Sequence, residues 1–341
     1  MRIAQRGTSS TTSGYGSVDR YRVNYSGTDE APTHAQVDVA SGTTPYTLGF
    51  RKALKITNGN QTSGAGSSDF IYLRQTLEAQ DIANSGWNYL SSSSYITLSY
   101  WIKSSVAQNF YGYLQSLDGT NYSYVWETGS LSADTWTKIT KTISGNSNLV
   151  FNNDTGEGLD IMLVRAFDGT DRTASMSLNG WATYSGTSRT PDQTSTWYTT
   201  NDATLEITGV QLEVGSVATD FEHRSYGQEL ALCQRYYFLF LEGNNKEIGA
   251  AWYYTASHAS FFFRFPVPMR AVPTGTDTTG TDYYTIYRNG GSDGLNSVAF
   301  ENGSTEQFSA YNSSEASGTA GQCGLIRATN ASAKIEFSAE L

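Results

Sequence analysis

The sequence has few charged residues, few prolines and almost no cysteine. Charged side chains make up 16% of the 341 residues, and there are 6 prolines and 2 cysteines. The cysteines, Cys233 and Cys323, are too far apart to indicate a disulfide framework, so we expect two buried thiols. No stretch approaches the roughly 20 apolar residues of a membrane-spanning helix, and the first ten residues lack the apolar core of a signal peptide. We expect a protein made in a cytoplasm, without membrane insertion.

Positive charge is also scarce. The formal net charge is -10, and the isoelectric point is about 4.8. Nucleic-acid binding requires clustered lysine and arginine, so this balance argues against a nucleic-acid partner. It argues equally against electrostatic attraction to anionic membranes or acidic glycans. A glycan partner would have to be held by ring stacking and hydrogen bonds.

The sequence is rich in aromatic residues and turn formers. Aromatic residues make up 13% of the chain, with 23 tyrosines and 33 glycines. Many short runs have the period-2 alternation of β-strands; the clearest, at 95–103, alternates Ile96 and Leu98 with Thr97 and Ser99. These patterns predict an all-β protein: a jelly-roll β-sandwich, then a short neck helix, then a second, smaller C-terminal β-sandwich.

Four regions are predicted along the chain. They are a lead-in or attachment segment (1–33), a jelly-roll domain (34–220), a neck helix (221–239) and a C-terminal β-sandwich tip domain (240–341). Residues 1–33 are polar and comparatively basic, which fits either a strand packed on the first domain or an attachment site for another protein. The helix start is indicated by Ser225 as a cap, with Gln228 at capping-box spacing.

Three stretches carry a resemblance to a known family. They are the run from Gly209 to Tyr237, which includes Leu-Ala-Leu-Cys-Gln-Arg-Tyr-Tyr, the opening Arg-Ile-Ala-Gln-Arg-Gly-Thr-Ser at 2–9, and Phe-Pro-Val-Pro-Met-Arg-Ala-Val-Pro-Thr at 265–274. They resemble tail-fibre and virion-appendage proteins of tailed bacteriophages. The order of patterns in 98–213 also resembles carbohydrate-binding jelly-roll modules.

The fibre resemblance implies a homotrimer on the virion, exposed on the particle, with other virion proteins bound through residues 1–33. One face of the predicted helix would then lie near the trimer axis. Its residues follow each other at helical spacing and are the candidates for the oligomer interface: Tyr226, Leu230, Cys233 and Tyr237.

No strong catalytic motif is present in the sequence. Glycoside hydrolysis needs two carboxylates about 5–10 Å apart. Glu206 and Glu213 lie on one predicted strand, where their spacing predicts opposite faces and too large a separation. We expect no cofactor; a structural calcium ion is the one metal considered, with Asp168 and Asp171 as its candidate ligands.

Aromatic side chains on loops or on one sheet face are the candidates for glycan binding. A flat ring can stack on the C–H face of a sugar at little cost in entropy. The candidates in the loop region 177–200 are Trp181, Tyr184, Trp197 and Tyr198, and those on a nearby strand are Tyr122 and Tyr124. For each of them, a place in the core or in a subunit contact is the alternative.

The sequence therefore predicts a trimeric phage tail fibre or appendage that adheres to a host cell-surface glycan without catalysis. A capsid decoration protein is the alternative, and a glycan depolymerase is the second alternative. The aromatic runs at 252–254 and 261–265 place rings on both faces of their strands, so we expect a subunit contact to cover the second face.

Overall fold

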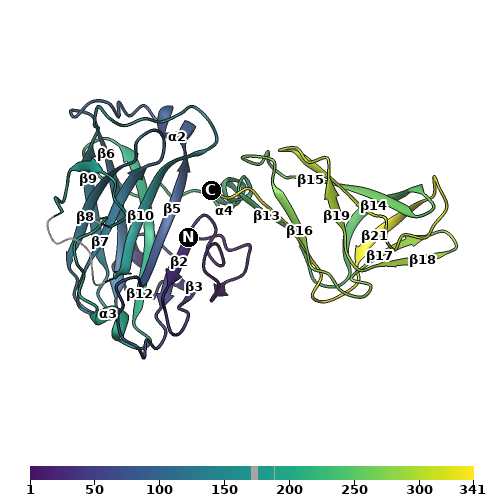
Figure 1. Cartoon of the computed structure of the whole chain (residues 1–341), viewed down its shortest axis with the longest axis horizontal. Coiled ribbons are helices and arrows are strands. Elements are labelled where there is room, and N and C mark those ends of the chain that lie inside the picture. Colours follow the sequence, from purple (N-terminus) through teal and green to yellow (C-terminus); the bar gives the residue numbers. More distant parts are fainter. Residues whose placement is uncertain (170–175, 188) are drawn as a thin grey trace. The chain divides into compact units, whose positions relative to one another are not determined.

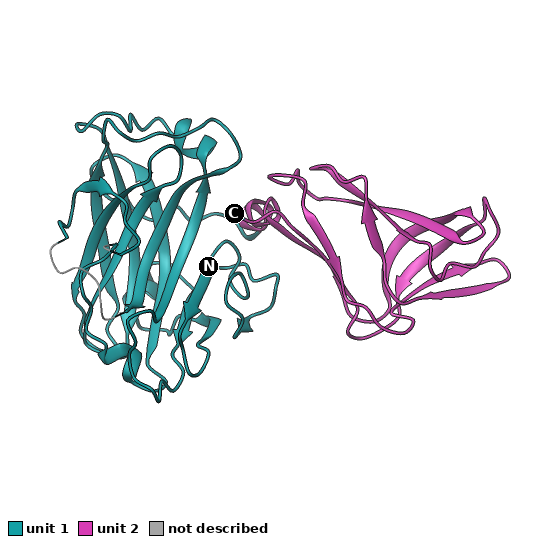
Figure 2. Ribbon diagram, in the orientation of Figure 1, with its two compact units in different colours: residues 1–226, 341 teal, residues 227–340 magenta. Residues whose placement is uncertain are grey.

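The computed structural model describes the whole chain except residues 170–175 and 188, and it contains two compact units (Figure 1). The first unit comprises residues 1–226 with residue 341, and the second comprises residues 227–340 (Figure 2). Both units are built from antiparallel β-sheets, which confirms the all-β class. The helices are α1 (Thr44–Thr47), α2 (Ala79–Ala83), α3 (Thr196–Thr199) and α4 (Tyr226–Gln234).

The first unit is a sandwich of two six-stranded sheets, and the chain crosses repeatedly between them in the manner of a jelly roll. Sheet A has the order β1 (Ser9–Ser10), β3 (Thr33–Asp38), β4 (Lys52–Thr57), β12 (Thr204–Val214), β6 (Tyr95–Ser104) and β9 (Thr137–Ser144). Sheet B has the order β11 (Trp181–Thr183), β8 (Tyr122–Ser130), β7 (Asn109–Ser116), β10 (Glu157–Asp168), β5 (Phe70–Glu78) and β2 (Arg22–Ser26).

The core of the first unit lies between the two sheets. Along β6, Leu98 and Tyr100 face this core and are fully buried in the same cluster as Leu163 of β10, whereas Thr97 and Ser99 lie on the other face of the strand and are buried as well. Tyr100 Oη donates to the Leu163 carbonyl oxygen at 3.0 Å, and it lies 3.3 Å from the donor Nε1 of Trp126. The polar atoms of these buried rings are therefore satisfied inside the core. Burial raises the pKa of Tyr100 far above its usual range.

Residues 1–33 are part of the first unit. β1 extends sheet A beside β3, and β2 extends sheet B beside β5. Ile3 and Val23 are buried, and Arg20, which adopts a positive φ of 69°, donates from its guanidinium to the Thr76 carbonyl oxygen at 2.8 Å. Of the two readings of this segment, the structure therefore shows the strand packed on the first domain.

A β-bulge interrupts β12 at Gly209, which has a φ of 63° that favours glycine. Thr208 lies opposite Trp101 of β6, but the next paired residue, Gln211, lies opposite Ser99. Three steps along β12 therefore match two steps along β6. After the bulge, the odd-numbered residues of β12 therefore point to the sheet face that the even-numbered residues occupy before it.

This reversal corrects one expectation about the two glutamates of β12. Glu206 lies opposite Lys103 and Glu213 lies opposite Thr97, so both carboxylates are on the same face of sheet A. The expected opposite faces are wrong. The expected separation remains large, since six residues of β6 span about 20 Å at ~3.3 Å per residue.

The second unit also contains two sheets around one core. The three-stranded sheet has the order β13 (Tyr237–Glu242), β22 (Lys334–Ser338) and β16 (Thr274–Asp277). The seven-stranded sheet has the order β18 (Gly291–Leu295), β17 (Tyr284–Arg288), β21 (Cys323–Ala328), β14 (Lys246–Thr255), β15 (His258–Arg264), β20 (Gln307–Asn312) and β19 (Ala299–Glu301). Aromatic residues fill the space between them; the rings of Phe263 and Phe337 are 5.3 Å apart.

The cysteines are unpaired with each other, and only one of them is a buried thiol. Cys233 is buried, whereas Cys323 is exposed on β21, so the expectation of two buried thiols is wrong for Cys323. Within the described part of the chain, no helix has the length and apolar character needed to cross a bilayer.

Candidate functional site

Two strands bring three of the predicted binding residues together at one edge of the first unit. β11 pairs with β8, so Trp181 lies opposite Tyr124 and Thr183 lies opposite Tyr122. The rings of Trp181 and Tyr124 meet edge to face with their centroids 5.6 Å apart. We call Trp181, Tyr122 and Tyr124 the edge cluster.

Hydrogen bonds between the two sheets fix the orientation of Trp181 and Tyr124. Trp181 Nε1 donates to the carbonyl oxygen of Ser144, at the end of β9 in sheet A, over 2.7 Å. Tyr124 Oη lies 3.5 Å from the carbonyl oxygen of Thr142 on the same strand. Because these contacts already hold the rings, little rotamer freedom remains to be lost on binding a ligand.

The three rings differ in exposure. Trp181 and Tyr122 are partly exposed, whereas Tyr124 is buried, and this burial raises the pKa of its phenol. Two exposed residues with hydroxyl groups lie nearby. Tyr95 is paired with Ser144 at the end of β9, and Thr183 of β11 lies opposite Tyr122 of β8. A rigid ring with an accessible surface and neighbouring hydroxyl groups can stack on a sugar. Trp181 and Tyr122 thus remain binding candidates, and Tyr124 supports Trp181 from within.

Tyr184 belongs to a different cluster. Its ring packs on Tyr113, with centroids 6.2 Å apart, in a small apolar group that also includes Val125 and Met162. The backbone N–H of Tyr184 donates to the Asn121 carbonyl oxygen at 2.8 Å. These positions lie outside the main core between the sheets. Tyr184 therefore fastens the chain after β11 onto sheet B and is separate from the edge cluster.

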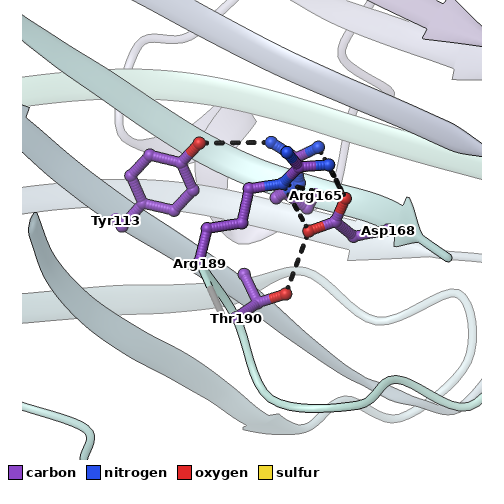
Figure 3. A network of polar contacts seen from close by, with 5 residues as sticks. All are labelled: Tyr113, Arg165, Asp168, Arg189 and Thr190. Carbon is purple, nitrogen blue, oxygen red and sulfur yellow. Dashed lines mark hydrogen bonds and ion pairs between the residues drawn. The ribbon is translucent and has the colours of Figure 1, made fainter. Parts of the chain in front are cut away.

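A buried polar network also fastens residues 189 and 190, which follow Tyr184 in the chain, to sheet B (Figure 3). Asp168 at the end of β10 accepts hydrogen bonds from Arg165 Nη2 at 2.7 Å, Arg189 Nη2 at 2.6 Å and Thr190 Oγ1 at 3.1 Å. Arg165 Nη1 also donates to Tyr113 Oη at 3.1 Å. The network joins β10 and β7 to residues 189 and 190, about 20 residues further along the chain.

This network removes Asp168 from the metal candidates. Its carboxylate is already shared by two arginines and a hydroxyl, and the two cations would repel a calcium ion. Burial lowers the pKa of Arg189, but its hydrogen bonds to Asp168 and the charge of that carboxylate raise the pKa above its usual range overall. Asp171 lies outside the described residues. Within the described chain, no group of three or more histidine, cysteine, aspartate or glutamate side chains is placed to hold a metal ion.

Trp197 and Tyr198 are core residues, so the prediction that they bind glycan is wrong. Their two side chains, which project from α3, are completely buried. Trp197 Nε1 donates to the Thr204 carbonyl oxygen at 3.1 Å, and Asn58 Nδ2 donates to the carbonyl oxygen of Tyr198 at 2.6 Å. The Tyr198 ring stacks on Phe167 at 4.3 Å. A one-turn helix thus directs both rings inward from a hydroxyl-rich segment.

The predicted oligomer face of the helix is only partly available. Tyr226 is 55% exposed and Leu230 is partly exposed, but Cys233 is buried. Tyr237 is also buried and belongs to β13, since α4 ends at Gln234 and the following apolar run pairs with β22. The prediction that four residues form one exposed stripe on the helix is therefore wrong for Cys233, which is buried, and for Tyr237, which is buried and lies outside the helix.

A second set of exposed rings lies on the seven-stranded sheet of the second unit. The exposed residues on its strands are Trp252, Tyr254, Phe262 and Tyr287. The sequence indicated the first three through adjacent aromatics at 252–254 and 261–265. Tyr287 was missed, because its neighbours in the sequence, Ile286 and Arg288, are not aromatic.

The two glutamates of β12 are occupied by other contacts. Glu206 forms an ion pair with Lys103 at 2.9 Å. Glu213 accepts hydrogen bonds from the backbone N–H and the hydroxyl of Thr219 at 2.9 and 2.7 Å. Burial raises the pKa of Glu213, but these hydrogen bonds and one from Gln211 lower the pKa below its usual value overall. A glycosidase acid needs a raised pKa, so Glu213 is unsuited to that role.

Comparisons with known proteins give a likeness of fold at low scores. No family model matches the chain, and no curated protein matches its sequence. Among solved structures, the enzymatically active domain of bacteriophage CBA120 tailspike protein 4 is similar, with a TM-score of 0.31 and 10% identity over 57% of this chain and 19% of the tailspike. The present chain thus spans a small part of that protein.

Two other similar structures are carbohydrate-binding modules. One is the N-terminal cellulose-binding domain of Cellulomonas fimi β-1,4-glucanase C, with a TM-score of 0.29 and 12% identity over 63% of this chain and 100% of that one. The other is the tandem CBM22-1 and CBM22-2 of Paenibacillus barcinonensis Xyn10C, with a TM-score of 0.28 and 9% identity over 99% of this chain and 94% of that one. Likeness at this level carries no argument about function.

Proposed function

We propose that this chain is a non-catalytic adhesion protein of a bacteriophage particle, a homotrimeric tail fibre or appendage that binds a host cell-surface glycan. The observation that carries the proposal is the edge cluster, where Trp181 is held rigidly and keeps part of its surface accessible. The place on a virion is supported by the sequence motifs at 2–9, 209–237 and 265–274, which resemble phage fibre proteins.

The edge cluster binds a neutral sugar by stacking. The indole of Trp181 covers a C–H face of the ring, and Tyr122 adds a second aromatic contact with a hydroxyl group. The formal net charge of -10 disfavours acidic glycans, so a neutral hexose or amino sugar is the expected class. Glu206 and Glu213 are committed to Lys103 and Thr219, which supports binding without hydrolysis.

The test is the variant Trp181→Ala in the full-length protein. Loss of one stacking ring should weaken binding to host cells about tenfold, for a contribution of ~1.4 kcal/mol. Trp136→Ala is the matched control, since Trp136 is also a partly exposed tryptophan but packs in a separate apolar cluster of the first unit. Binding should be followed on host cells and on a glycan array, with circular dichroism to confirm folding. Unchanged binding by a folded Trp181→Ala protein would refute the role of the edge cluster.

The position on the particle has a separate test. Antibodies against residues 274–341 should label the tail of intact particles if the chain is a fibre or appendage. Label spread over the head would favour the capsid decoration protein instead.

A further inference from the structure

The seven-stranded sheet of the second unit has one buried face and one open face. Along β14 and β15, the buried residues Ala251, Tyr253, Phe261 and Phe263 alternate with outward-facing residues. Several outward positions carry large rings: Trp252 is 36% exposed, Tyr254 73%, Phe262 52% and Tyr287 44%. We call this side of the sheet, which carries the four rings, the open face. An antiparallel sheet with one solvated face normally alternates apolar and polar residues, so this pattern departs from the rule.

The strand register places these rings on one continuous surface. The rings of Trp252 and Phe262, on neighbouring strands, are 6.4 Å apart. Tyr287 lies opposite Leu325 of β21, which in turn lies opposite Ala250 of β14. The apolar surface thus extends from β17 across β21 and β14 to β15.

The size of this surface suits a protein contact. At ~200 Å² per fully exposed aromatic side chain, the four rings leave roughly 400 Å² accessible, near the largest apolar patch of a typical monomer. A stable interface buries about 800 Å² on each partner. The rings provide about half of that area, and the residues around them provide the rest.

The centre of the open face suits a protein better than a sugar. The residues opposite or between Trp252, Phe262 and Tyr287 are Ala250, Ser260, Ser292, Ser309, Cys323 and Leu325, with no carboxylate, carboxamide or amine among them. His258 lies beside Tyr254, with the ring centroids 5.9 Å apart. Sugar sites depend on such polar groups converging around the stacking ring. Protein interfaces combine aromatic residues and arginine at the centre with few lysines or acids.

The rim carries charges of both signs. Arg327 pairs with Glu247 at 3.1 Å and lies 5.6 Å from the Tyr287 ring centroid. On the other side, exposed Arg264 follows Phe262 on β15, and Glu301 of β19 lies in the row that continues from Phe262 through β20. A partner with the same mixed rim can pair opposite charges, which offsets the repulsion between two acidic chains.

We infer that three copies of this chain pack with their open faces towards a common threefold axis, so that each open face is covered by the open faces of the other two copies. This inference rests on the homo-oligomer in the proposed function and identifies its contact. It transfers the contact from the predicted helix stripe, where Cys233 and Tyr237 are buried, to β14, β15, β17 and β21. Glycan binding by the edge cluster does not depend on it.

The test is the mass of the full-length protein in solution, by light scattering and sedimentation equilibrium over a range of concentrations. The wild type should have the mass of three chains of 37.2 kDa. The double variant Trp252→Ser and Phe262→Ser should dissociate, with self-association weakened by at least ~30-fold for ~2 kcal/mol of lost contact. Val272→Ser is the control, because Val272 is an exposed apolar residue outside the strands of this unit. Circular dichroism should show that both proteins stay folded.

A thiol reagent provides an independent readout. Cys233 is buried and Cys323 is exposed opposite Trp252, so the reagent reports on the open face. Cys323 should react slowly in the assembled wild type, faster on dilution, and fastest in the double variant. A reaction rate independent of concentration in an assembled wild type would contradict the inference.

The remaining outcomes separate this inference from the proposed function. A folded double variant that keeps the wild-type mass would place the contact elsewhere and overturn the inference alone. A monomeric wild type would overturn both the homotrimer and the open-face contact, without affecting binding by the edge cluster. A double variant that keeps its mass but loses glycan binding would assign the open face to a sugar and overturn the inference.

Discussion

The edge cluster and the open face both present aromatic rings, but the two regions hold them differently. Trp181 is fixed by a hydrogen bond to sheet A and by the ring of Tyr124. On the open face, Phe262 projects from β15 and Tyr254 from β14, and each is more than half exposed. Rigid, partly covered rings suit a small ligand that binds by stacking. Broadly exposed rings suit a large surface that covers them.

The same contrast applies to the energy of folding. A ring inside the sandwich stabilises the fold through buried area and packing, whereas a ring on an open surface contributes little until a partner covers it. Substitutions of these rings should therefore separate into effects on unfolding and effects on association.

Trp197→Ala should cause the largest loss of stability. The side chain is completely buried in α3, and its indole N–H donates to the Thr204 carbonyl oxygen. Truncation of a buried tryptophan costs about 3–5 kcal/mol of the free energy of unfolding. Phe262→Ala on the open face is the comparison, with an expected change within ~0.5 kcal/mol for the dissociated chain. Chemical denaturation measures both, and similar losses for the two variants would contradict the burial contrast.

Asp168→Asn should cause the next largest loss. The substitution keeps the size of the side chain but leaves Arg165 and Arg189 buried without their shared carboxylate. Breaking a buried ion pair in this way costs about 3 kcal/mol. Unfolding of the first unit should shift, while that of the second should not.

Calcium provides a control for the same residue. If Asp168 held calcium, the wild type would gain stability on adding calcium chloride, and Asp168→Asn would abolish that gain. We expect no calcium-dependent shift in the melting temperature of the wild type.

The sequence predicted the sandwich architecture because alternation is a local property. Residues 95–103 show which side chains face the core without knowledge of their partners. The bulge at Gly209 could be suspected from the slip in the apolar pattern of β12. The same slip, from Leu205 and Ile207 to Val210 and Leu212, already implies the reversal of faces that places Glu206 and Glu213 on one face, and the register with β6 shows it.

The binding candidates were harder to predict, because their burial depends on distant partners. Trp197 and Tyr198 occur among serines and threonines that suggest an exposed loop, and only the packing against Phe167 and Thr204 shows them to be core residues. Asp168 was a candidate calcium ligand in the sequence, and only the contact with Arg189, 21 residues away, shows that its carboxylate belongs to an ion pair. The open face was easier, since adjacent aromatics on a strand always face both sides.

The smallest predicted effect is a pH dependence confined to the first unit. His34 is buried; its Nε2–H donates to the Thr12 carbonyl oxygen at 2.9 Å, and its Nδ1 accepts from Ser17 Oγ at 2.8 Å. Burial lowers the pKa of His34 below its usual 6.5, although the hydrogen bond to Thr12 opposes this. The unfolded chain therefore binds a proton more readily. The stability that His34 contributes should be complete above pH 6.5 and decline as the pH falls through the folded-state pKa.

His34→Gln should remove this dependence in the first unit, while His223→Gln should leave it intact because His223 is exposed. The second unit supplies an internal comparison, because Asp277 makes its stability depend on pH in the opposite direction. Burial raises the pKa of Asp277, so its contribution is complete below the usual 3.8 and is lost as the pH rises through the folded-state value. Hydrogen exchange of the two units between pH 5 and 7 measures the difference. An equal loss of protection in both units over that range would show that His34 is not the titrating group.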